Sequence, residues 1–310
     1  MHNLISLKDW SAENIQHVIE LASKIKLNPS NFKDKMVGKS LLMIFEKPSL
    51  RTRLSFEAGM TQMGGHAIYY NVGNSPMGSG KESISDSIKV SSRFVDIIMA
   101  RLFNHSDLVE MANYSTVPII NALTDDSHPC QILADLLSIK EKKNKLKGIN
   151  VTYFGDGLNN VTHSLMVGGV KMGMHITICC PSEKEFTPRQ DIINLCNDAA
   201  VISSGSIKII NNPLEAINNA DVVYTDSWMS YHIPKEQEEN RIKTLLPYQV
   251  NKKLMSLART DAIFMNCLPA SREYEQTADV IDGIQSIVFD QAENRLHAQK
   301  AIMIHLLNLK

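Results

Sequence analysis

The segment SLLMIFEKPSLRTRLSFE, residues 40–57, decides the fold of this chain because it joins a short apolar run to the start of a helix. The run SLLMIF has the length of a buried strand, and helical spacing of apolar residues begins after the turn at Pro48 and Ser49. The same order of turn, apolar run of about four to eight residues and helical pattern recurs along the chain. Parallel sheets covered by helices produce this order, so we predict the α/β class.

The apolar runs fall into two groups, which predict two mainly parallel sheets flanked by helices. Strands are expected at 40–45, 67–71, 96–100 and 117–121 in the first sheet, and at 150–154, 175–180, 207–210, 221–226 and 261–266 in the second. A predicted helix, 131–140, leads into the charged run KEKKNKLKG, which we interpret as a solvated junction.

The junction divides the 310 residues into about two domains, as their length also suggests. We expect a first domain over 1–143 and a second over 144–290. The final segment, 291–310, has apolar residues at helical spacing that need a partner surface. We predict that it forms a helix that returns to the first domain and completes it.

Composition excludes several classes of protein. Lysine plus arginine total 32 against 33 aspartate plus glutamate, so no broad basic field attracts nucleic acid or anionic lipid. No stretch approaches the roughly 18 apolar residues of a membrane helix, and the opening residues do not resemble a signal peptide, so we expect a cytoplasmic protein. The five cysteines are odd in number and have no CxxC spacing, which predicts reduced thiols and no structural zinc.

Polar groups follow the first predicted strand, where ligands of open parallel sheets bind. Ser49, Arg51, Thr52 and Arg53 lie at the start of the next helix. Such a start offers backbone N–H groups and a partial positive charge, and arginine adds a planar fork that matches phosphate oxygens. Ser49 alone would indicate an ordinary helix cap. With three further donors beside it, the segment predicts an anion site.

The other strands of the first sheet end in groups that can polarise a carbonyl oxygen. Arg101 directly follows the strand at 96–100, and His128 and Gln131 lie in the segment after the strand at 117–121. Between the second and third predicted strands, the Gly- and Ser-rich stretch 71–83 has Lys81 as its only cation. It is either a surface loop or a mobile loop that closes on an anion.

The second sheet repeats this arrangement with different chemistry. The sequence GDGLNN after the strand at 150–154 begins like a dinucleotide fingerprint, but Asn160 stands where its third glycine should fall. Asp226, with Ser230 nearby, ends another strand and supplies a carboxylate suited to an ammonium group. Cys267 follows the last strand, before Leu268 and Pro269, where a thiol is a candidate for reactivity or hydrogen bonding.

Five segments, FEKPSLRTRLSFE, HPCQ, DSWMS, NCLPA and AENRLH, resemble in sequence and order the signatures of the ornithine carbamoyltransferases. The first two are shared with aspartate carbamoyltransferases, whereas the Asp-x-x-x-Ser and Cys-Leu-Pro segments are similar to those of the ornithine members. The resemblance implies transfer of the carbamoyl group of carbamoyl phosphate to the δ-amine of L-ornithine, giving L-citrulline and phosphate, in arginine biosynthesis or arginine/citrulline metabolism. Neither a metal nor another cofactor is implied.

The resemblance also implies roles for individual residues. Carbamoyl phosphate would be bound by Ser49, Leu50, Arg51, Thr52, Arg101, His128, Gln131, Cys267, Leu268 and Arg295, and ornithine by Asn160, Asp226, Ser230 and Tyr231. Arg101, His128 and Cys267 would be the catalytic residues. The family further implies a homotrimer, or a multiple of it, in which the loop around Lys81 reaches a neighbouring subunit.

Three positions depart from the family pattern. Leu50 replaces a frequent threonine, where a backbone N–H can still serve the phosphate, and Asn266 replaces the histidine that usually precedes the cysteine. Ser230, Tyr231 and His232 stand in place of Ser-Met-Gly, which changes the bulk of the amine-binding loop and removes a glycine. Amine specificity and loop motion are therefore open.

The implied mechanism is attack of the neutral δ-amine on the carbonyl carbon, with Arg101, His128 and Thr52 stabilising the charge that develops on the carbonyl oxygen. Either Cys267 or the departing phosphate can take the amine proton. Two other interpretations remain at this stage: carbamoyl transfer to putrescine or an N-acylornithine, and, from another class, a nicotinamide-dependent oxidoreductase. The incomplete GDGLNN fingerprint argues against the oxidoreductase.

Overall fold

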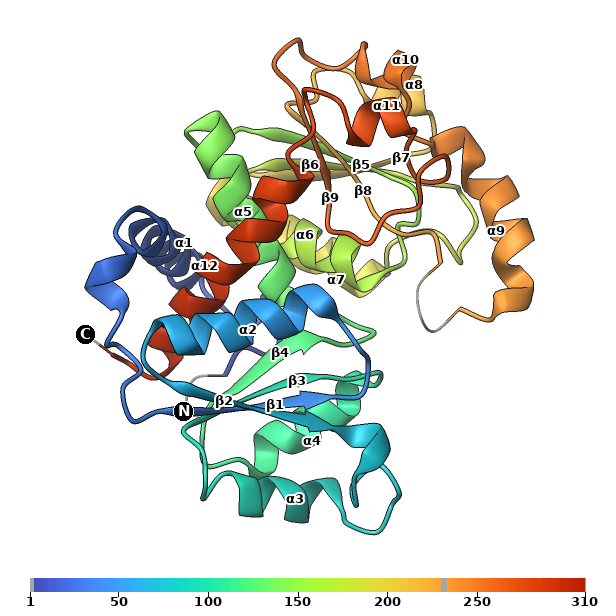
Figure 1. Cartoon of the computed structure of the whole chain (residues 1–310). Coiled ribbons are helices and arrows are strands. Elements are labelled where there is room, and N and C mark those ends of the chain that lie inside the picture. The colour runs from blue at the N-terminus through green and yellow to red at the C-terminus, as the bar shows by residue number, and fades with distance from the viewer. Residues whose placement is uncertain (1–2, 230–232, 310) are drawn as a thin grey trace. The chain divides into compact units, whose positions relative to one another are not determined.

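The computed structural model describes residues 3–229 and 233–309 and divides the chain into two compact units. One unit comprises Met1–Leu137 together with Glu293–Lys310, and the other comprises Ser138–Ala292. The expected domain boundaries, at 143/144 and 290/291, lie six residues after and two residues before these limits. They remain a prediction. Both units have a parallel sheet with flanking helices, which confirms the predicted α/β class (Figure 1).

The first unit contains a four-stranded parallel sheet in the order β2-β1-β3-β4. Its strands are β1 (Ser40–Phe45), β2 (His66–Asn71), β3 (Ile97–Arg101) and β4 (Ile119–Leu123). The first strand has the predicted bounds, and the fourth begins two residues later than the predicted start at 117. Because the chain passes from β1 to β2 on one side and then to β3 on the other, the strand order reverses between β1 and β3. This switch point is where open sheets bind ligands.

Helices cover both faces of this sheet, with α2 on one face and α3 and α4 on the other (Figure 1). The helices of this unit are α1 (Ala12–Leu27), η1 (Pro29–Phe32), α2 (Leu50–Gln62), η2 (Val72–Asn74), α3 (Ile84–Ser91) and α4 (His105–Tyr114), with most of α5 (Pro129–Lys143) and α12 (Val288–Leu306). Ser49 begins α2 because its Oγ accepts a hydrogen bond from the backbone N–H of Thr52 at 3.3 Å. The extended segment that follows β1 therefore ends at Ser49, and α2 begins there.

The C-terminal helix returns to the first unit, as the sequence predicted. Ile302, Met303 and Leu306 of α12 are buried. Gly59 of α2 permits close packing, since a Cβ there would lie 3.4 Å from Cγ of Lys300. The returning helix also brings Arg295 into the first unit.

The second unit contains a five-stranded parallel sheet in the order β7-β6-β5-β8-β9. Its strands are β5 (Asn150–Phe154), β6 (His175–Cys179), β7 (Ser206–Ile210), β8 (Val222–Thr225) and β9 (Ile263–Asn266). Its helices are α6 (Asn160–Lys171), α7 (Gln190–Ser203), α8 (Pro213–Ala216), η3 (Lys235–Gln237), α9 (Glu238–Leu245), η4 (Leu246–Tyr248), α10 (Lys252–Met255) and α11 (Ala278–Ile281). The strand order reverses between β5 and β8, so a second switch point lies there.

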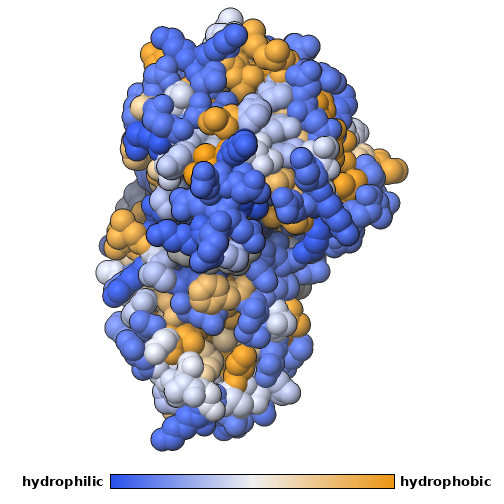
Figure 2. All heavy atoms as spheres, turned by 90° about the vertical axis from the view of Figure 1, so that its right-hand side faces the viewer, coloured by the Kyte–Doolittle hydropathy of each residue, from blue (hydrophilic) through white to orange (hydrophobic). Residues whose placement is uncertain are grey.

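Two helices, α6 and α7, cover one face of the second sheet, and the short helices α8, α10 and α11 cover the other (Figure 1). None of the helices in the described part of the chain is both long and apolar enough to cross a membrane. On the face drawn in Figure 2, hydrophobic side chains are scattered among hydrophilic ones. Because open parallel sheets bind ligands where the strand order reverses, functional groups are best sought at the two switch points.

Candidate active site

The switch point of the first unit holds a hydroxyl group flanked by two buried arginines. Oγ1 of Thr52, in the first turn of α2, lies 3.4 Å from Nη1 of Arg101 and 3.4 Å from Nη2 of Arg295, each of which donates a hydrogen bond to it. Ser49 donates to the same oxygen at 3.1 Å. From the sequence, Ser49 and Thr52 were expected in the anion site and Arg101 beside a carbonyl oxygen, and the resemblance added Arg295. The structure brings these four side chains together from the start of α2, from β3 and from α12.

Gln131 extends this cluster along α5. Its Oε1 accepts a hydrogen bond from Nη1 of Arg295 at 2.6 Å, and its Nε2 donates to Oδ1 of Asp135 at 2.8 Å. Asp135 is fully buried and was not among the residues expected from the sequence. Its position in the sequence could have indicated it, because Asp135 stands four residues after Gln131 and therefore on the same face of the helix. Asp135 thus orients the amide that in turn orients Arg295.

His128 lies beside the cluster with only 4% of its surface exposed. Burial, followed by the charges of Arg295, Arg101 and Arg51, lowers the pKa of His128 well below 6.5. The imidazole is therefore neutral near pH 7. A neutral imidazole can donate a hydrogen bond to a carbonyl oxygen without adding a further buried charge to the three guanidinium groups.

Lys47 is a further cation that the sequence reasoning missed. It follows β1 and is buried, with its ammonium nitrogen 4.3 Å from the centre of the Phe103 ring. Burial and the charge of Arg101 lower the pKa of Lys47 to about 8. Its place two residues after the strand, in the same connecting segment as Ser49, was the available signal.

Three other residues that the sequence singled out, Leu50, Arg53 and Lys81, are exposed. The Leu50 side chain is 70% exposed, which leaves only its backbone at the helix start for an anion. Arg53, counted with the donors from sequence alone, lies instead on the outer side of α2, where it contacts Glu57 at 3.0 Å and the Tyr69 ring at 4.1 Å. It therefore does not belong to the cluster. Lys81 is exposed in the loop before α3.

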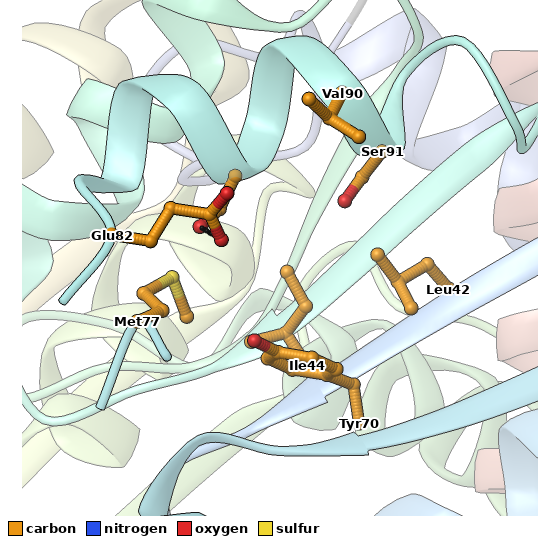
Figure 3. A pocket seen from close by; sticks show the side chains of 8 residues that line it. Leu42, Ile44, Tyr70, Met77, Glu82, Val90 and Ser91 are labelled. Carbon is orange, nitrogen blue, oxygen red and sulfur yellow. Dashed lines mark hydrogen bonds between the residues drawn. The ribbon is translucent and has the colours of Figure 1, made fainter. Parts of the chain in front are cut away.

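A separate cavity of about 130 Å³ lies in the first unit between α3 and strands β1 and β2 (Figure 3). Its lining consists of Leu42, Ile44, Tyr70, Met77, Glu82, Ser87, Val90 and Ser91. Only one of these side chains is charged, and that charge is negative. The cavity is therefore unsuited to a phosphate, which the arginine cluster fits.

In the second unit, Asp226 and Cys267 meet at the ends of the neighbouring strands β8 and β9. Sγ of Cys267 donates a hydrogen bond to Oδ1 of Asp226 at 3.0 Å. Asp226 is 8% exposed, and Cys267 is half-buried. Burial, together with the charge of Asp226, raises the pKa of Tyr153 on β5 well above 10. The pair thus combines a carboxylate and a thiol at the second switch point.

Asn160 is the first residue of α6, and the helix is capped by its neighbour Asn159, whose Oδ1 accepts from the Thr162 N–H at 2.8 Å. Asn159 also donates to the Tyr153 hydroxyl at 3.0 Å. Asn159 is therefore the cap, and Asn160 is the first residue inside the helix. Ser230, Tyr231 and His232, expected in the amine-binding loop, lie outside the described residues.

Asn266, the departure from the family pattern, stabilises the turn that holds Cys267. Its side chain is buried, accepts from the Leu268 N–H at 2.8 Å and donates to Oε1 of Gln276 at 2.9 Å. Its backbone N–H donates to Oε1 of Gln291 at 3.1 Å. Asparagine therefore serves as a structural link at this position.

The arrangement offers no cluster suited to a resident metal: the described residues contain no group of three or more His, Cys, Asp or Glu side chains that could hold one. One unit presents guanidinium groups, hydroxyl groups and a neutral imidazole. The other presents a carboxylate and a thiol. Chemically, the first set suits an anion with a polarisable carbonyl group, and the second suits an amine.

Comparison with known proteins relates both units to one family. Residues 2–141 match the family model "Aspartate/ornithine carbamoyltransferase, carbamoyl-P binding domain", and residues 147–306 match "Aspartate/ornithine carbamoyltransferase, Asp/Orn binding domain". The anabolic ornithine carbamoyltransferase of Pyrococcus furiosus is 47% identical over 97% of this chain and 95% of its own length. An ornithine carbamoyltransferase of Anoxybacillus flavithermus is 46% identical over 98% and 96%.

Solved structures show the same relationship in three dimensions. The ornithine carbamoyltransferase structure from Pyrococcus furiosus superimposes with a TM-score of 0.94 at 46% identity, covering 99% of this chain and 97% of that one. The match extends over both units and the segments that carry the candidate residues.

Proposed function

Because this chain belongs to the aspartate/ornithine carbamoyltransferase family, we propose that it transfers the carbamoyl group of carbamoyl phosphate to the δ-amine of L-ornithine, giving L-citrulline and phosphate. A carbamoyltransferase is a transferase, which sets aside the nicotinamide-dependent oxidoreductase. The observation that carries the choice of ornithine is the buried Asp226 carboxylate beside Cys267. A negative charge pairs with the α-ammonium group of ornithine, whereas the second carboxylate of aspartate would require cations.

For carbamoyl phosphate, we propose that the helix start at Ser49, Leu50 and Thr52 binds the phosphate through backbone and hydroxyl groups, with Arg51 as its charged partner. Arg101, His128, Gln131 and Arg295 contact the carbamoyl group. The neutral state of His128 supports this division of roles, since its N–H can stabilise the carbonyl oxygen as negative charge develops there. Removing one such donor typically costs about 3 kcal/mol of transition-state stabilisation.

For ornithine, we propose that Asp226 pairs with the α-ammonium group, with Asn160, Ser230 and Tyr231 as further contacts. The δ-amine must be neutral to attack the carbonyl carbon, so a proton has to leave it. A route through Cys267 balances when the thiol passes its own proton along the hydrogen bond to Asp226 as its sulfur accepts the proton of the δ-amine. The departing phosphate is the other acceptor.

We also propose a homotrimer, or a multiple of it, acting in the cytoplasm in arginine biosynthesis. Apolar side chains left exposed on α2 and on the edge strand β2 support an assembly: Leu50, Leu54, Ile68 and Tyr69. In such an assembly the loop of Lys81 reaches a neighbouring subunit. Light scattering of Leu54→Asp, which places a charge in this patch, should show a smaller particle than the wild type. A fully active wild-type monomer would refute the shared loop.

A substrate panel tests the proposed reaction. Phosphate release and the carbamoylated product are measured with carbamoyl phosphate and, in turn, ornithine, N-acetylornithine, putrescine and aspartate. We expect turnover with ornithine and formation of citrulline. An acylated α-amine has no charge for Asp226, and putrescine has no α-carboxylate. Faster turnover with either of these amines than with ornithine would overturn the substrate assignment.

A further inference from the structure

We propose that Glu275 is a positioning residue for the amine half of the reaction, because its carboxylate holds the two segments that carry Asp226 and Cys267 at a fixed spacing. This inference rests on the proposed function, since it assigns the purpose of that spacing to ornithine binding. Glu275 itself need not touch either substrate.

The two oxygens of Glu275 bind the backbones of two different segments. Oε1 accepts from the backbone N–H of Trp228 at 3.2 Å, and Oε2 accepts from that of Ser271 at 2.9 Å. Trp228 lies two residues after Asp226, and Ser271 lies four residues after Cys267. One side chain therefore links the segment after β8 to the turn after β9.

The linked segments are the same ones whose side chains meet at 3.0 Å, from Sγ of Cys267 to Oδ1 of Asp226. The hydrogen bond between the sulfur and the oxygen requires that the backbones of the two segments keep a fixed distance from each other. Trp228 is held on its other side as well, because its carbonyl oxygen accepts from Nε of Arg241 at 3.1 Å. Arg241 is in turn fixed by a buried ion pair with Asp156.

The turn that contains Glu275 holds the Cys267 segment through a second side chain. Oε1 of Gln276 accepts from Nδ2 of Asn266 at 2.9 Å, and Nε2 of Gln276 donates to the carbonyl oxygen of Ser271 at 3.2 Å. The Cys267 turn is thus secured at both ends. Gln276 and Gln291 hold its strand side through Asn266, and Glu275 and Gln276 hold its far side through Ser271. Of the two side chains Glu275 and Gln276, it is Glu275 that also binds the Asp226 segment, through the backbone N–H of Trp228.

The position of Glu275 is unfavourable for a carboxylate, so its two hydrogen bonds to backbone N–H groups must offset the cost of burying it. Its surface is 2% exposed, and burial raises its pKa to about 7, with Asp226 adding to the rise and the bound backbone N–H groups opposing it. The nearby guanidinium group of Arg241 is bonded to Asp156. A neutral side chain would fill this space at lower cost, but it would not accept two backbone N–H groups at once.

The test compares Glu275→Gln with Glu273→Gln, a matched control in the same turn. Gln keeps the size of Glu275 but presents one acceptor and one NH₂ group, so one backbone link is lost. Glu273 is exposed, and its side chain accepts a hydrogen bond from the Ala278 N–H at 2.9 Å. We expect Glu275→Gln to raise the KM for ornithine roughly tenfold, with the Kd for carbamoyl phosphate unchanged. Glu273→Gln should change neither.

A second readout needs no substrate. Cys267 is half-buried while the other four cysteines are buried, so it should be the first thiol to react with iodoacetamide. If Glu275 holds the two segments together, Glu275→Gln should change the rate of Cys267 alkylation several-fold, with Cys267→Ser identifying the signal.

The outcomes separate the two proposals. A wild-type protein that does not carbamoylate ornithine contradicts the proposed function, whereas the alkylation rates still test the link. A Glu275→Gln protein with a lowered melting temperature but unchanged ornithine KM and Cys267 reactivity overturns the positioning role. So does an equal loss of carbamoyl phosphate and ornithine affinity.

Discussion

In the first unit, the ends of β1 and β3 gather guanidinium groups, whereas in the second unit the ends of β8 and β9 gather carboxyl and thiol groups. Each unit buries groups of like charge close together: Arg101 with Arg295 in one, and Asp226 with Glu275 in the other. Such groupings raise the energy of the empty protein, and a ligand of opposite charge relieves it. The difference therefore teaches that each half is specialised for the charge of one substrate.

The largest expected effect separates Arg51 from its neighbour Arg53. Arg51→Ala removes a charged and bidentate contact to a dianion, so carbamoyl phosphate affinity should fall roughly 100-fold or more. Arg53→Ala removes a side chain that contacts Glu57 and Tyr69, and should leave this affinity nearly unchanged. Isothermal titration of both variants measures the contrast. If the two variants bind carbamoyl phosphate equally well, the assignment of phosphate binding to Arg51 is wrong.

Asp226 gives the corresponding test of the amine half. Asp226→Asn keeps the size of the side chain but removes its charge, and a charged hydrogen bond contributes about 1.5–3 kcal/mol, so ornithine binding should weaken roughly 10- to 150-fold. Carbamoyl phosphate affinity should barely change. Both affinities and the melting temperature are measured on the same variant. A loss of stability with unaltered ornithine binding would assign Asp226 to the fold instead.

Lys47 adds to the first unit a positive charge that depends on pH. Because its pKa is lowered to about 8, the ammonium group is charged at pH 7 and mostly neutral at pH 9. Lys47→Met should therefore weaken carbamoyl phosphate binding roughly fivefold at pH 7, equivalent to about 1 kcal/mol, and hardly at all at pH 9. A loss of the same size at both pH values would show that packing, and not charge, is responsible.

The smallest effect concerns stability and His128. The unfolded chain binds a proton at this residue as the pH falls below 6.5, but the folded chain does not, because its pKa is well below that value. The neutral imidazole thus stabilises the fold fully above pH 6.5, and this contribution is lost as the pH falls toward the folded pKa. The free energy of unfolding should fall between pH 6.5 and pH 5.5, and His128→Asn should make this fall smaller by about 1 kcal/mol. Urea unfolding at both pH values measures it, and an unchanged decline would contradict the neutral state.

Local patterns in the sequence determined the class of the fold and the chemistry at the strand ends. Runs such as residues 40–45 and 150–154 became strands with the predicted bounds, because a short apolar run between turns satisfies both sheet pairing and burial. The helix start after Ser49 followed from its capping hydroxyl group. The returning C-terminal helix followed from an apolar face that needed a partner.

Tertiary structure alone decided which of these groups meet. Thr52 and Arg295 are 243 residues apart, and Asp226 and Cys267 are 41 apart, yet each pair is joined by a hydrogen bond. Their contact depends on strand order, on the return of α12 and on turns such as that of Glu275, whose role no local pattern indicated. Arg51 and Arg53 look equivalent in sequence, but the helical period turns one toward the cluster and the other toward Tyr69. Sequence specified the groups available at each strand end, and the packing of distant segments selected those that act together.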